Sequence, residues 1–186
     1  SPKDDKLKIF KNVDILIENS KITKIANDIV NADEEIDADG ALITPGFVDS
    51  HTHPIFSGNR AKEFSMRAAG KSYQEIAKMG GGIISSINQL REMDEDQLFE
   101  ECLERVNFFL NHGTTTIEAK SGYGLTLKDE LKSLRVIKKL NQESALDIIP
   151  TFLGAHDFPP EYKNNKSDYI DIICEEMIPE VVENNL

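Results

Sequence analysis

Apolar and polar residues follow two different patterns along this chain. In the first 43 residues, the runs Val13–Ile17 and Ile22–Ile25 flank the turn-prone segment Glu18–Lys21, which is typical of a β-hairpin. A further apolar run covers residues 36–43. The segment is too short and too polar to fold alone, so we interpret residues 1–43 as part of a small β-sandwich-like domain.

From residue 44 onward, strand patterns alternate with helix patterns. Strands are predicted at residues 43–50, 114–118, 146–153 and 169–174. Helix starts are predicted at Ser72 (with Glu75 as a capping box), Asp94, Thr126 and near Pro179. Such alternation predicts βαβ units and a parallel sheet.

Polar side chains follow the first three predicted strands, where each loop begins. They are His51, His53 and Arg60 after the first strand, Lys120, Ser121 and Tyr123 after the second, and His156 after the third. Functional residues at the carboxyl ends of successive parallel strands are characteristic of a (β/α)8 barrel. A doubly wound sheet obeys a similar rule, but the chain has no glycine-rich phosphate-binding motif.

A complete barrel needs about 250 residues, and the chain has 186. We therefore expect residues 44–186 to form about the first half of a barrel. Two unpaired strand edges would then make the isolated chain unstable, prone to aggregation or self-associating.

The sequence His51-Thr52-His53 lies at the end of the first predicted barrel strand. Residues two apart in a strand point to the same side, so both imidazoles can face one point. Imidazole is a common ligand of zinc and iron. The motif therefore predicts a metal site.

Composition narrows the classes of partner. The formal net charge of −12 argues against nucleic acid, which binds basic surfaces. No apolar run approaches the roughly 20 residues that cross a membrane. We expect a cytoplasmic protein, with Cys102 and Cys174 as small buried residues in a reducing compartment.

Residues 44–53, Thr-Pro-Gly-Phe-Val-Asp-Ser-His-Thr-His, resemble the metal-binding first strand of the amidohydrolase superfamily. Narrower matches, at residues 57–60, 69–73, 80–83, 118–125 and 151–156, resemble the imidazolonepropionase family. This resemblance implies hydrolysis of the ring amide of 4-imidazolone-5-propanoate to N-formimidoyl-L-glutamate, a step of histidine degradation.

The resemblance also implies site roles. His51 and His53 would bind one zinc or iron ion, while Arg60, Tyr123, His156 and, more weakly, Tyr73 would bind the substrate. Lys120 is expected to be structural or electrostatic, and His112 to cap a helix. A third histidine, an acidic residue acting on the water and an aspartate ligand would come from later strands, so we expect this chain alone to be inactive. The full-length protein is expected to be a homodimer.

Three other interpretations stay open at this point. Another cyclic amidohydrolase or aminohydrolase, similar to guanine deaminase or hydantoinase, would share the two histidines but has no reason to carry Arg60 together with the Ser121–Gly124 loop. A non-catalytic metal-binding domain could keep the same scaffold. A doubly wound nucleotide-binding module is disfavoured by the missing phosphate motif.

Overall fold

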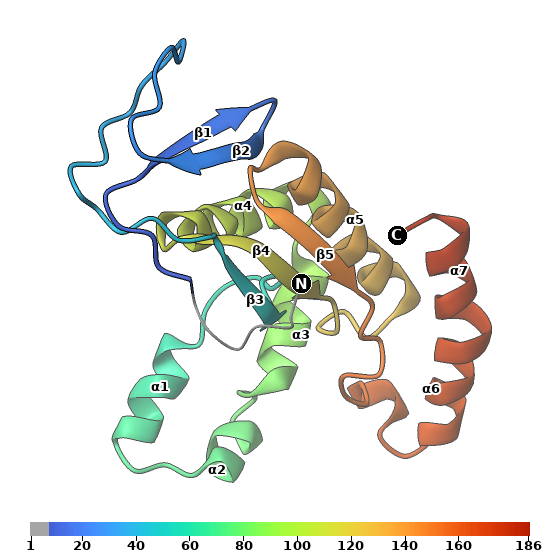
Figure 1. Cartoon of the computed structure of the whole chain (residues 1–186). Coiled ribbons are helices and arrows are strands. Elements are labelled where there is room, and N and C mark those ends of the chain that lie inside the picture. The colour runs from blue at the N-terminus through green and yellow to red at the C-terminus, as the bar shows by residue number, and fades with distance from the viewer. Residues whose placement is uncertain (1–7) are drawn as a thin grey trace. The chain divides into compact units, whose positions relative to one another are not determined.

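The computed structural model describes residues 8–186, which form two compact units divided between Pro45 and Gly46 (Figure 1). The first unit contains a β-hairpin. The second contains a parallel sheet with its covering helices, and it carries all the predicted site residues. We describe each unit by itself.

The first unit is built around strands β1 (Asp14–Glu18) and β2 (Lys21–Ala26), which pair antiparallel. Asn19 and Ser20 form the two-residue turn, both with positive φ (53° and 61°), as tight hairpins with the right twist require. The predicted hairpin is confirmed. The apolar run at residues 36–43 forms no strand, and its Ile36 and Leu42 are exposed, so the prediction of β-structure there was wrong.

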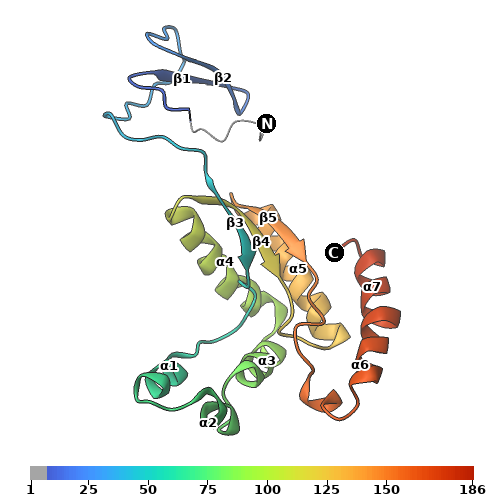
Figure 2. The same cartoon turned by 60° about the horizontal axis from the view of Figure 1, so that its bottom comes forward.

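The second unit contains a three-stranded parallel sheet in the order β3–β4–β5 (Figure 2). Its strands are β3 (Phe47–Thr52), β4 (Thr114–Lys120) and β5 (Asp147–Thr151). Residue 47 pairs with 114 and residue 120 with 151, so the carboxyl ends of all three strands lie at one edge of the sheet. The described residues form a mixed α/β unit, and no closed barrel is seen within them.

One face of the sheet is covered by α4 (Glu95–Asn111) and α5 (Leu127–Glu143), which lie side by side in Figures 1 and 2. The alternation along β4 explains this packing, because Ile117 and Ala119 are fully buried against the helices while Glu118 between them faces the other side. Ile149 of β5, next to Glu118 in the register, remains 56% exposed. The apolar core therefore lies between the sheet and these two helices.

The helix caps read from the sequence are present. Asp94 and Thr126 cap α4 and α5 by accepting backbone N–H groups, as N-cap residues do. Ser72 and Glu75 form a full capping box at the start of α2 (Tyr73–Lys78). Between residues 60 and 95, the sequence did not predict α1 (Ala61–Ala68) or α3 (Ile83–Glu92).

The predicted fourth strand at residues 169–174 is helical. Short helix η1 (Pro160–Tyr162) leads into α6 (Lys166–Ile172), a π-helical turn η2 (Ile173–Met177) and α7 (Ile178–Glu183). Tyr169, Ile173 and Met177 are four residues apart and buried together. This helical stripe outweighs the β-branched composition that suggested a strand.

Tyr169 also anchors the loop that follows β5. Its hydroxyl donates a hydrogen bond to the buried carbonyl of Gly154 (2.7 Å), and its ring packs against Phe158 and Tyr162. The C-terminal helices are thereby attached to the functional edge of the sheet.

Cys102 is fully buried, as predicted, whereas Cys174 is exposed because it lies on the outer side of the π turn. Across residues 8–186, none of the helices combines the length and apolarity needed to cross a lipid bilayer.

Candidate active site

Four aromatic rings from three different strand ends meet at one edge of the sheet. His51 lies near the end of β3 and His53 directly follows that strand, while Tyr123 lies in the loop after β4 and His156 in the turn after β5. The ring centroid of His53 lies 5.4 Å from that of His51, 5.8 Å from that of Tyr123 and 5.0 Å from that of His156. Four of the six predicted metal- and substrate-binding residues are thus brought together around His53.

The local electrostatics favour a neutral His53. Burial lowers the pKa of its imidazole, and electrostatic interactions with His156, His51 and Lys120 lower it further, against the raising effect of Glu118. Neutral imidazole is the form that ligates metals. The Nδ1 atom of His53 is buried and has no hydrogen-bond partner within the described chain. His51 and His53 are therefore suited to supply two of the ligands of a metal ion.

Among residues 8–186, no three His, Cys, Asp or Glu side chains are placed to hold a metal ion together. A catalytic zinc is usually held by three protein ligands. His51 and His53 suit a metal by type and spacing, but the ion needs ligands besides these two.

His156 is oriented by the loop that carries Tyr123. Its Nδ1 lies 2.8 Å from the carbonyl oxygen of Gly122, and a carbonyl can only accept, so Nδ1 carries the proton. In the neutral imidazole, the other ring nitrogen, Nε2, is then a hydrogen-bond acceptor. Gly122 has φ 106°, and a Cβ there would lie 2.8 Å from the Cβ of His156. Only glycine allows this approach.

Arg60 lies at the start of α1, outside the cluster of rings. Its Nη2 forms an ion pair with Glu63 (2.6 Å), whose second oxygen accepts the backbone N–H of Gly82 (3.0 Å). Both groups line a cavity of about 360 Å³ between α1, α2 and α3. The charge of Arg60 opposes the effect of burial, which raises the pKa of Tyr123.

Tyr73 is the residue least connected with the cluster. It is the first residue of α2 and 56% exposed, and its hydroxyl lies beside Gly82, where a Cβ would be 3.2 Å away.

Sequence reasoning missed Glu118 and Thr151, on the same face of the sheet as the histidines. Glu118 pairs through Oε1 with Lys120 and accepts a hydrogen bond from the Thr151 hydroxyl (2.7 Å). These contacts lower the pKa of Glu118 despite partial burial. Glu118 and Lys120 are two residues apart in β4 and therefore lie on the same face of the sheet, a spacing from which their ion pair could have been predicted. The structure thus shows Lys120 in an ion pair with Glu118. His112 is the C-cap residue of α4, and its Nδ1 lies 2.8 Å from the carbonyl oxygen of Phe108.

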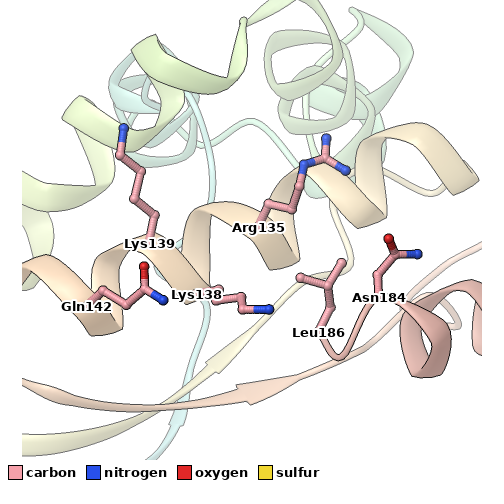
Figure 3. A pocket seen from close by; sticks show the side chains of 6 residues that line it. All are labelled: Arg135, Lys138, Lys139, Gln142, Asn184 and Leu186. Atoms are coloured by element: carbon pink, nitrogen blue, oxygen red, sulfur yellow. The ribbon is translucent and has the colours of Figure 1, made fainter.

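A second cavity, of about 260 Å³, lies between α5 and the C-terminal residues (Figure 3). Its three cations already have partners, because Arg135 pairs with Glu95, Lys138 donates to the Asn185 carbonyl, and Lys139 lies near Asp96 and over the Phe99 ring. This cavity is also remote from the strand ends, so it is no candidate for the active site.

Comparison with known proteins shows what this chain is similar to. A model of the amidohydrolase family matches residues 34–82. Imidazolonepropionase of Aliivibrio fischeri is 46% identical over 98% of this chain, and those of Shewanella halifaxensis and Vibrio parahaemolyticus are 53% and 54% identical over 79% and 82% of it.

The chain is homologous to imidazolonepropionase. The family resemblance drawn from the motifs is thereby confirmed. The chain spans 46%, 36% and 37% of the length of these three imidazolonepropionases. It therefore corresponds to less than half of each of them.

Proposed function

We propose that this chain contributes the first metal-binding and substrate-binding residues of an imidazolonepropionase. The whole protein would hydrolyse the ring amide of 4-imidazolone-5-propanoate to N-formimidoyl-L-glutamate. One water is consumed: its hydroxyl joins the ring carbonyl carbon, the carbon–nitrogen bond breaks, and the nitrogen takes the proton. The observation that supports this assignment most is the meeting of His51, His53, Tyr123 and His156.

The fold proposed for the whole protein is a (β/α)8 barrel, of which β3, β4 and β5 would be the first three strands. Two observations support this. The helices α4 and α5 cover only one face of the sheet, and the opposite face carries Glu118, Lys120 and Thr151, which would point into the interior of a barrel. Residues 8–45 would belong to the small β-domain, with strand pairing limited here to the hairpin.

His51 and His53 would hold one zinc or iron ion. When bound, such an ion lowers the pKa of a coordinated water from 15.7 to about 7, which supplies hydroxide at neutral pH. The lowered pKa of His53 keeps its imidazole neutral and available.

The substrate roles divide between ring and tail. His156 donates from Nδ1 to the Gly122 carbonyl, so Nε2 of its neutral imidazole can accept a hydrogen bond from an N–H of the substrate ring. Tyr123 offers a protonated hydroxyl, since burial raises its pKa. Arg60 would bind the propanoate with its planar fork of donors, after exchanging part of its contact with Glu63. Tyr73, at the rim, would be an outer contact.

The test uses the complete protein loaded with metal. The loss of ultraviolet absorbance of 4-imidazolone-5-propanoate is followed with and without a chelator, and metal content is measured in parallel. His53→Ala should abolish turnover and lower bound metal at least tenfold. His112→Ala is the matched control, because His112 only caps α4, and it should retain both.

Metal-bound protein that leaves this substrate intact but hydrolyses guanine or hydantoins would reassign the substrate within the superfamily. Metal binding without turnover of any of these compounds would favour a non-catalytic domain. Light scattering on the same sample tests the expected homodimer, and cell fractionation tests the expected cytoplasmic location.

A further inference from the structure

The loop between β4 and α5, residues 121–125, is held by a single buried carboxylate. Glu130, on the first turn of α5, is 0% exposed. Its Oε2 accepts the N–H of Gly122 (3.0 Å), and its Oε1 accepts those of Gly124 (2.9 Å) and Leu125 (2.8 Å). Three backbone donors of one loop therefore converge on two oxygens of one side chain.

The carbonyl groups of the same loop are held from the other side. Arg91 of α3 donates from Nε to the Gly124 carbonyl (2.8 Å) and from Nη2 to that of Leu125 (3.4 Å), and it also pairs with Glu161. A Cβ on Gly124 would lie 2.6 Å from the backbone carbon of Asp129. The loop is therefore fixed by both its donors and its acceptors against the start of α5.

This anchorage extends to two side chains of the candidate site. Tyr123 lies between the glycines that bind Glu130. Gly122 gives its N–H to Glu130 and its carbonyl to His156 Nδ1, so a short path of hydrogen bonds joins Glu130 to the His156 imidazole. The rings of Tyr123 and His156 are 5.2 Å apart and both contact His53.

Burying a carboxylate is costly unless hydrogen bonds compensate for the lost water. Packing of α5 against the core requires no charge at this position, since an apolar residue would fill the same space without that cost. What requires a carboxylate is the loop, because two acceptor oxygens are needed to bind three N–H groups that point inward.

We propose that Glu130 is a positioning residue that sets Tyr123 and His156 at the distances they keep from His53. It is not one of the rings around His53, and it acts on them through the backbone N–H groups of Gly122, Gly124 and Leu125. Its effect on substrate rests on the function proposed above, whereas its effect on the two rings does not.

The test substitution is Glu130→Gln in the complete, metal-loaded protein. Glutamine has the same shape but only one acceptor oxygen, so its amide group must face at least one loop N–H as a second donor. Asp129→Asn is the matched control. Asp129 is the neighbouring buried carboxylate on the same helical turn, but its partners are Lys132 (2.9 Å) and Thr126 (2.8 Å), outside the loop segment 122–125.

We expect Glu130→Gln to raise KM about tenfold, the equivalent of about 1.4 kcal/mol, with a smaller change in kcat. Asp129→Asn should change KM less than about threefold, even if it lowers the urea midpoint of unfolding as much as Glu130→Gln does. In a Tyr123→Ala background, Glu130→Gln should add much less to KM, because the ring it positions is gone. Equal effects of the two carboxylate variants, or full additivity with Tyr123→Ala, would overturn the proposal.

A second readout does not depend on the substrate. Selectively labelled tyrosine and histidine ring resonances of the complete protein can be assigned by single substitutions at Tyr123, His156 and His112. Glu130→Gln should shift the ring signals of Tyr123 and His156 and leave that of His112 in place, while Asp129→Asn should shift none of the three. Unmoved Tyr123 and His156 signals refute the positioning role, whereas shifted signals in a protein without turnover refute only the proposed function.

Discussion

Replacing Tyr169 with phenylalanine removes one hydroxyl and nothing else, which makes it a sharp test of how the loop after β5 is held. The hydroxyl is buried and donates to the Gly154 carbonyl at 2.7 Å. Without it, a buried acceptor is left unsatisfied, at a cost of about 1–3 kcal/mol. The ring contacts with Phe158 and Tyr162 remain, so no loss of apolar packing adds to this figure.

The assay is urea unfolding followed by circular dichroism, with the free energy of unfolding compared between variants. Tyr162→Phe is the control, since its ring packs on Tyr169 but its hydroxyl has no hydrogen-bond partner within residues 8–186. It should cost less than about 0.5 kcal/mol. Equal losses for the two variants would show that the Gly154 contact does not stabilise the loop.

Three further outcomes are expected. Burial raises the pKa of the Cys102 thiol to about 11, so a thiol reagent at pH 8 should titrate only the exposed Cys174 in the folded chain and both cysteines in urea, as measured by absorbance. Ile137→Ala should lower the free energy of unfolding by about 2–5 kcal/mol, because Ile137 is fully buried between α5 and the sheet. Gly124→Ala should cost about 1–3 kcal/mol by the same urea assay, since its Cβ would press on the start of α5.

The sequence was most informative where a local rule acts on few residues. Strand alternation placed His51 and His53 on one side, and the parallel arrangement brought Tyr123 and His156 to the same edge. Caps at Ser72, Asp94 and Thr126 also follow from local hydrogen bonding, which a tripeptide or tetrapeptide already encodes.

Predictions failed where packing over a longer distance decides. Residues 169–174 have the composition of a strand, yet the stripe from Tyr169 to Met177 makes them helical. The roles of Glu130 and Arg91 depend on the path of a loop that neither residue belongs to, and no sequence spacing reveals that path. The exposure of Cys174 depends in the same way on which side of the helix packs inward.

The loops after β4 and β5 are bonded to each other as well as to their own strands. The backbone N–H of Ser121 donates to the Thr151 carbonyl (3.0 Å), and the Ser121 hydroxyl accepts a hydrogen bond from the Leu153 N–H (2.9 Å). The Gly122 carbonyl accepts a hydrogen bond from Nδ1 of His156. For protein engineering the pair is a single module. A change of substrate preference attempted by exchanging one loop alone would break these bonds, so both loops must be transplanted or diversified together.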